Sequence, residues 1–194
     1  TLGSSSMEFT EKNFAEGDFS DIVYVTANGF LTDELMEDLI GRSEIFHEKF
    51  DTVKTDWERE KGTVMPEPVA RDAKTAENLF PDKKKMIHFL QPHHPFIGKE
   101  FGDRMRDPIN PEEHTTAYDL AERGELEKEE IREAYKENLE IVLEKAQGLA
   151  EELDGQTVIT ADHGDLLGES GLFGHYLAES KIKHLREVPW DVYD

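Results

Sequence analysis

An Asp-His-Gly segment carries the clearest chemical signal in this chain of 194 residues. Asp162, His163 and Gly164 directly follow the apolar, β-branched run at residues 157–160. We expect that run to be a strand, and we expect Gly164 to allow a turn that brings both side chains to one ion. A carboxylate beside an imidazole suits zinc, manganese or iron, whereas carboxylates alone favour magnesium or calcium. The segment therefore predicts a divalent metal site with Asp162 and His163 as ligands.

Two ligands are too few for a metal site, and other segments carry side chains that could join it. These are Ser4, Ser5 and Ser6 near the start of the chain, His93 between two prolines, and His175 after Gly174. The serines, His93 and residues missing upstream are candidates for the missing ligand. Each segment also has a simpler interpretation, because serines are common in flexible ends, a His-Pro loop can be rigid and solvated, and an aspartate often caps a turn.

Apolar runs alternate with helical patterns, and this alternation predicts an α/β architecture. We expect strands over residues 21–26, 85–90 and 157–160, helices over 31–40, 69–80 and 129–153, and a final strand starting near 185–190 with Trp190 packed in the core. Residues 99–121 lack periodicity and predict a long surface loop or lid. The economical arrangement is one three-layer α/β/α sandwich over residues 1–194, with a mostly parallel central sheet and its chemistry at the carboxyl ends of the strands.

The charge of the chain limits its partners. Aspartate and glutamate total 44 against 22 lysines and arginines, so the formal net charge is −22 and the isoelectric point is near 4.7. Such a surface disfavours binding to nucleic acid and to anionic membranes. The acidic excess is also typical of halophilic proteins, although the many lysines argue against that interpretation.

The composition also excludes several kinds of site. The chain has no cysteine, which excludes disulfides, zinc-thiolate sites and cysteine nucleophiles. No apolar run approaches the roughly 18 residues of a membrane-spanning helix. The N-terminus has no signal-peptide pattern, which predicts a cytoplasmic location, although Thr1 is not an initiator and an upstream signal could be missing.

Several motifs together resemble the sulfatase-like branch of the alkaline phosphatase superfamily, most closely the compact sulfatase-like proteins of salt-loving archaea. The motifs are Thr-Ala-Asp-His-Gly-Asp at residues 160–165, Gly-His at 174–175, the Pro-His-His-Pro-Phe loop at 92–96, and Arg-Glu-Val-Pro-Trp at 186–190. The resemblance spans nearly the whole chain. It implies an alkaline phosphatase-like fold and a metal-assisted hydrolase of phosphate or sulfate esters, in which a serine or threonine attacks beside a divalent cation.

The resemblance also implies roles for individual residues. It makes Asp162 and His163 metal ligands, and it directs His93 and His175 toward the anionic oxygens of the substrate. The nucleophile falls in the serine run at residues 4–6. We place it at Ser5 by preference and leave Ser4 and Ser6 open.

One family feature has no counterpart in the chain. The family supplies a further metal-binding aspartate from the first strand, upstream of the nucleophile, and the chain begins after that point, so the domain is expected to be N-terminally truncated. Without cysteine, a formylglycine made by oxidising cysteine is excluded, which favours phosphate over sulfate esters.

Two classes of function follow. The first is a metal-dependent hydrolase or transferase, with zinc, manganese, magnesium or calcium, that acts on a small-molecule, glycan-linked or lipid-linked phosphate or sulfate ester. The alternative is a non-catalytic or truncated sulfatase-like domain that acts as a binding or assembly module.

Overall fold

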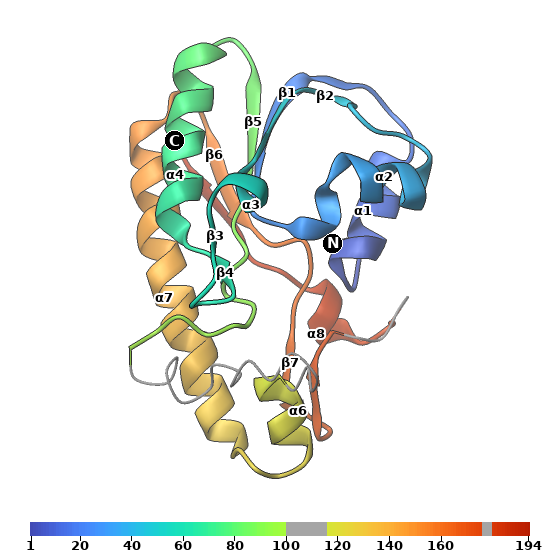
Figure 1. Ribbon diagram of the computed structural model, residues 1–194, viewed down its shortest axis with the longest axis vertical. Coiled ribbons are helices and arrows are strands. Elements are labelled where there is room, and N and C mark those ends of the chain that lie inside the picture. Colours follow the sequence, from blue (N-terminus) through green and yellow to red (C-terminus); the bar gives the residue numbers. More distant parts are fainter. Residues whose placement is uncertain (100–115, 176–179) are drawn as a thin grey trace.

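The computed structural model describes residues 1–99, 116–175 and 180–194 (Figure 1). The helices there are α1 (Ser6–Phe14), η1 (Gly29–Leu31), α2 (Asp33–Ile40), α3 (Thr52–Thr55), α4 (Pro66–Leu79), α6 (Ala117–Glu122), α7 (Lys128–Glu152) and α8 (Lys183–Arg186). The strands are β1 (Phe19–Thr26), β2 (Phe46–Asp51), β3 (Trp57–Glu58), β4 (Thr63–Val64), β5 (Lys84–His88), β6 (Thr157–Thr160), β7 (Leu166–Glu169), β8 (Leu172–Gly174) and β9 (Trp190–Tyr193).

A parallel sheet with strand order β2-β1-β5 forms the centre of the fold. The middle strand, β1, is buried on both faces, which explains its nearly continuous apolar sequence. Val23 and Val25 point to one face and Tyr24 to the other, and none of the three is exposed to solvent. The sheet therefore supports two cores, one on each side.

Helices cover both faces of this sheet, in agreement with the expected three-layer α/β/α class (Figure 1). On one face Val23 and Val25 pack with Val69 and Ala76 of α4, and α7 lies against α4 and β6. On the other face Tyr24 packs with Phe14 of α1, with Leu31 and Met36, and with the aromatic rings around them. The mixed α/β class with a parallel sheet is confirmed.

The segment around the Asp-His-Gly motif is antiparallel. Strand β6 pairs with β9, and β7 and β8 form a hairpin directly after the motif. The hairpin packs through Phe173 against α6 and the start of α7, where Tyr118 and Ile131 are fully buried. This small core anchors the chain that follows the motif.

The longest helix follows its predicted pattern. Helix α7 covers Lys128–Glu152, against the expected 129–153, and its buried residues recur at helical spacing. The residues are Ile131, Ala134, Asn138, Val142, Leu149 and Ala150. Its remaining face is acidic and solvated. Neither α7 nor any other helix of the described ranges is long and apolar enough to cross a membrane.

The short helix expected over residues 31–40 is confirmed as α2, which follows a 3₁₀ turn and ends at Gly41 with φ +66°. Two other expectations need correction. The segment 99–121 lies mostly outside the described residues, but its end is α6, a helix whose capping box joins Thr116 and Asp119. Trp190 was expected in the core but is 69% exposed. Its strand, β9, pairs with β6 alone among the described strands.

Candidate active site

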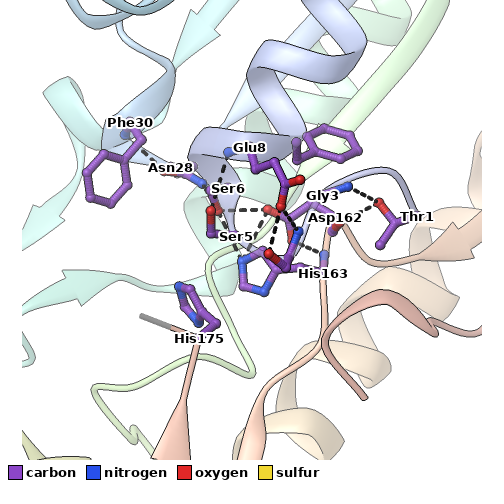
Figure 2. Close-up of polar contacts among 12 residues, drawn as sticks. Thr1, Gly3, Ser5, Ser6, Glu8, Asn28, Phe30, Asp162, His163 and His175 are labelled. Carbon is purple, nitrogen blue, oxygen red and sulfur yellow. Dashed lines mark hydrogen bonds and ion pairs between the residues drawn. The ribbon is translucent and has the colours of Figure 1, made fainter. Parts of the chain in front are cut away.

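Three strand ends and one helix start meet at Ser6, the first residue of α1 (Figure 2). Asn28 lies just past the end of β1, His88 is the last residue of β5, and Asp162 follows β6. The carboxyl ends of parallel strands β1 and β5 share one edge of the sheet, which is where α/β folds place ligands. Residues far apart in the sequence are thereby brought into direct contact.

The Ser6 hydroxyl is the centre of this arrangement. It donates a hydrogen bond to Asp162 Oδ2 at 2.7 Å and accepts one from Asn28 Nδ2 at 3.0 Å. His163 Nε2 lies 3.3 Å from the same oxygen. The structure therefore brings both residues of the predicted metal pair to one serine, as the pattern requires.

Hydrogen-bond directions show that lone pairs converge here. His163 Nδ1 lies 2.9 Å from the carbonyl oxygen of Gly164, so this nitrogen is a donor, and in the neutral tautomer with this bond the lone pair is on Nε2. Asp162 Oδ2, Ser6 Oγ and His163 Nε2 then have one proton among them, the one in the Ser6–Asp162 bond. Such a group of acceptors is stabilised by a cation.

The spacing of these atoms fits a metal ion. Ligands at 2.0–2.1 Å from a tetrahedral zinc ion lie about 3.3–3.4 Å apart. The corresponding separations are 2.7 Å for Ser6 Oγ to Asp162 Oδ2, 3.3 Å for Ser6 Oγ to His163 Nε2 and 3.6 Å for Asp162 Oδ2 to His163 Nε2. Small side-chain movements would seat an ion on these three atoms.

His88 was not identified as a site residue from the sequence, although it lies within the strand predicted over residues 85–90. Its Nε2 lies 3.7 Å from Asp162 Oδ2, and its Nδ1 lies 2.8 Å from the hydroxyl oxygen of Tyr24. Burial lowers the pKa of His88 despite the neighbouring carboxylate of Asp162, so the imidazole is neutral at neutral pH. A neutral imidazole beside Asp162 holds that carboxylate in place and is itself competent to bind a metal.

The glycine of the motif is explained by packing. A Cβ at Gly164 would lie 2.1 Å from the carbonyl oxygen of His184, and the Gly164 N–H donates to the carbonyl oxygen of Leu185 at 3.0 Å. Gly164 does not have a positive φ, so it is the close approach of α8 that requires glycine rather than the turn we expected. The C-terminal segment thereby packs directly on the loop that bears Asp162 and His163.

Ser4 and Ser5 have structural partners of their own. The Ser4 hydroxyl donates to Glu8 Oε2 at 2.6 Å and accepts from the Ser180 N–H at 3.0 Å, and Ser4 is fully buried. Ser5 is the N-cap of α1, where its hydroxyl accepts from the Glu8 N–H. Of the three candidate serines, the structure places Ser6 against the Asp162–His163 pair.

A buried ion pair holds the serine segment in place. Arg186 donates two hydrogen bonds to Glu8, at 2.7 and 2.9 Å, and also bonds the carbonyl oxygens of Leu2 and Ser180. Burial alone would raise the pKa of Glu8, but hydrogen bonds from Ser4 and Arg186 outweigh it and lower that pKa to about 2. The Arg-Glu-Val-Pro-Trp motif thus has a structural role, because Arg186 fixes the start of α1.

A second polar pair lies opposite Ser6. His175 follows Gly174, whose φ is +73°, and its Nδ1 lies 2.6 Å from Asp165 Oδ1. Burial would raise the pKa of Asp165, but the hydrogen bond from His175 and the nearby histidines keep it below its usual value. An ionised carboxylate can only accept, so His175 Nδ1 is the donor. The Asp165 side chain is only 5% exposed, and it orients His175.

The His175 ring stands between the other histidines. Its centroid lies 4.1 Å from that of His163 and 5.0 Å from that of His93. His93 therefore lies on the same side of the site as His175, although burial lowers its pKa and leaves it neutral at neutral pH. We expected both histidines to face the anionic oxygens of a substrate. The Nδ1 of His93 faces the carbonyl oxygen of His94, so a neutral His93 ring leaves only the lone pair of Nε2 for the site and adds no positive charge there.

Asn138 of α7 holds the loop that carries His93 through hydrogen bonds. Asn138 is fully buried, and its Oδ1 accepts from the Ile97 N–H at 2.7 Å. Its Nδ2 lies 3.2–3.3 Å from the carbonyl oxygens of Pro92, His93 and Pro95. The Asn138 amide thus supplies hydrogen-bond partners to backbone groups of a loop that has no regular secondary structure.

The donor set offers two places for a cation. Besides the atoms around Ser6, His163, Asp165 and His175 offer ligand atoms within 4.8 Å of one another. Asp162, like Asp165, keeps a pKa below its usual value against the effect of burial, because His88, His163 and Ser6 interact with the carboxylate. Two carboxylates among imidazoles, with side chains 15% and 5% exposed, make a cluster that attracts a divalent cation.

Comparisons with known proteins agree with the fold. No protein-family model matches the chain, and no curated protein does. The soluble domain of lipooligosaccharide phosphoethanolamine transferase A from Neisseria meningitidis is similar in structure, with a TM-score of 0.64 and 13% sequence identity. The integral membrane form of that transferase gives a TM-score of 0.66, also at 13% identity. All of this chain is covered, but it spans only 63% and 39% of those two chains. The likeness shows an alkaline phosphatase-like fold.

Proposed function

We propose that this chain is a metal-dependent hydrolase or transferase of phosphate esters, with Ser6 as its nucleophile. The observation that carries the proposal is the position of Ser6 Oγ, 2.7 Å from Asp162 Oδ2 and 3.3 Å from His163 Nε2. The similar solved structures are those of a phosphoethanolamine transferase, which supports phosphate-ester chemistry and a lipid-linked substrate as one candidate. The lack of cysteine supports phosphate over sulfate.

Asp162 and His163 would hold a divalent cation, zinc, manganese, magnesium or calcium, with Ser6 Oγ as a third ligand atom. Bound there, the cation would make the Ser6 hydroxyl more acidic and offset negative charge on the substrate. The buried acceptors around Ser6 would otherwise repel an anionic ester.

The residues of the chain supply the remaining steps. Ser6 Oγ attacks phosphorus, its proton passes to solvent water, and the bond from phosphorus to the leaving oxygen breaks as that oxygen takes a proton from water. The N–H groups in the first turn of α1 adjoin Ser6 and favour an anion there. In its doubly protonated form, His175 would keep its Nδ1–H on Asp165 and donate a hydrogen bond from Nε2 to a phosphoryl oxygen. Water, or an alcohol in a transferase, then takes the phosphoryl group from the phosphoserine, and the Ser6 hydroxyl is restored.

A labelling experiment tests the proposal. The protein is incubated with 4-nitrophenyl phosphate and Mn²⁺ or Zn²⁺, quenched with acid, and analysed by peptide mass spectrometry. We expect a phosphoryl group on Ser6, and we expect Ser6→Ala to lower turnover by at least about 10³-fold. Ser43→Ala is the matched control, since Ser43 is a serine outside the site that bonds only Glu37 among the contacts in the structure.

A separate experimental result would contradict each component of the proposal. A phosphoryl group on Ser5 in the Ser6→Ala variant would move the nucleophile to Ser5. Unchanged metal affinity in Asp162→Ala, measured by calorimetry, would argue against the Asp162–His163 ligand pair, and loss of metal in Asp165→Ala alone would favour the alternative group. If no ester is cleaved and no serine is labelled with metal present, the chain is a non-catalytic module.

A further inference from the structure

An apolar groove of about 230 Å³ lies on the surface between α1 and α2. Its lining residues are Met7, Phe30, Leu35, Asp38 and Leu39. Met7 is 50% exposed, Phe30 54% and Leu35 42%. In a chain with a net charge of −22, large apolar side chains gathered at one exposed place are more consistent with a binding surface than with a solvated one.

Two groove residues are tied to the Ser6 site. Met7 follows Ser6 in α1, so the reactive hydroxyl and one groove wall are neighbours in the chain. On the other wall, the Phe30 N–H donates to Asn28 Oδ1 at 2.9 Å, while Nδ2 of the same amide donates to Ser6 Oγ at 3.0 Å. The Asn28 side chain therefore links Ser6 to the backbone of Phe30. Figure 2 shows Phe30 on the opposite side of Ser6 from Asp162.

The polar and apolar parts of this region are separate. Hydrogen-bonding groups gather around Ser6, and four of the five groove residues are apolar. Asp38, the one charged residue in the lining, disfavours an anion in the groove itself. A ligand with an anionic head and an apolar tail would therefore bind in one orientation, with its head at Ser6.

We propose that the groove binds the apolar alkyl, acyl or aryl group of an ester whose phosphate lies at Ser6. This inference rests on the proposed function and narrows its substrate class to amphiphilic phosphate esters. A volume of about 230 Å³ equals that of roughly seven or eight water molecules at ~30 Å³ each, enough for a short alkyl chain or one aromatic ring.

The test compares binding of hexyl phosphate and methyl phosphate by calorimetry, with excess Mn²⁺, at concentrations where neither forms micelles. Each buried methylene group strengthens binding about four-fold, so even two buried methylenes give hexyl phosphate an advantage of more than about ten-fold. Leu35→Gln and Phe30→Gln should each reduce this hexyl-to-methyl ratio toward one. Leu79→Gln is the matched control, since Leu79 is 62% exposed on α4, outside the groove, and its ratio should equal that of the wild type.

The outcomes separate the groove from the chemistry at Ser6. Three results would overturn the groove proposal, even if phosphoserine forms. They are a hexyl-to-methyl affinity ratio near one in the wild type, no binding of hexyl phosphate, and a fall of the ratio in Leu79→Gln equal to that in Leu35→Gln. A preference for hexyl phosphate that Leu35→Gln removes supports the groove, even if no ester is cleaved and the proposed function fails. Light scattering adds one further outcome: a dimer that Leu35→Gln converts to a monomer, with a ratio near one, would make the groove a contact between two copies.

Discussion

Replacing Asn138 with leucine should both destabilise the fold and displace His93. Asn138 has no exposed surface, and its amide serves four backbone groups of the loop that follows β5. Leucine fills a similar volume but can serve none of them. The Ile97 N–H loses a 2.7 Å bond, and the carbonyl oxygens of Pro92 and Pro95 lose their shared donor.

The size of the effect follows from these contacts. Losing the hydrogen bond from the Ile97 N–H costs about 1 kcal/mol net, and leaving buried polar groups without a partner costs a further 1–3 kcal/mol or so. We therefore expect Asn138→Leu to lower the free energy of unfolding by about 2–4 kcal/mol. Asn138→Asp keeps the acceptor for Ile97 but turns a carboxylate oxygen toward carbonyl oxygens, so it should be destabilising as well.

Urea unfolding followed by circular dichroism measures this change. The matched control is Asn78→Leu, because Asn78 lies on the exposed face of α4 and its Nδ2 bonds only the Lys74 carbonyl oxygen among the contacts in the structure. It should change stability by less than about 0.5 kcal/mol. An Asn138→Leu protein as stable as the wild type, or a loss no larger than in the control, would refute the view that one amide holds the loop.

Three other changes test the electrostatics. Hydrogen bonds from Ser4 and Arg186 overcome the effect of burial and lower the pKa of Glu8 to about 2. The charged carboxylate therefore stabilises the fold above pH 4.5, and this stabilisation is lost as the pH falls toward 2. Thermal melts should therefore show the advantage of the wild type over Glu8→Gln shrinking over that range, and an advantage that grows on acidification would contradict the assignment. With a net charge of −22, the melting temperature should rise from low to molar NaCl as self-repulsion is screened, and a steady fall would be inconsistent with it. Asp165→Asn, which loosens the orientation of His175, should lower kcat toward an aryl phosphate by about 10–100-fold with a smaller change in KM, whereas an unchanged kcat would remove Asp165 from the site.

Much of the fold could be predicted from local patterns. The strand over residues 157–160 and the long helix ending at Glu152 agree with their predicted bounds to within a residue or so, because a β-branched run and a period-3.6 apolar pattern are properties of neighbouring residues. Strand β2 was not identified, because residues 46–51 mix aromatic and charged side chains without a clear strand pattern. Their pairing with β1 makes them a strand. Trp190 was expected in the core, but its strand pairs on one edge only among the described strands.

The sequence by itself determined the acidic surface, the α/β class and the placement of a carboxylate and an imidazole after a strand. Tertiary structure decided which serine lies beside them, that His88 joins them, and that Asp165 is buried against His175. The physical reason is distance along the chain. Ser6 and Asp162 are separated by 156 positions, and no local pattern encodes their contact. It depends on the packing of α1, β1, β5 and β6 around one edge of the sheet.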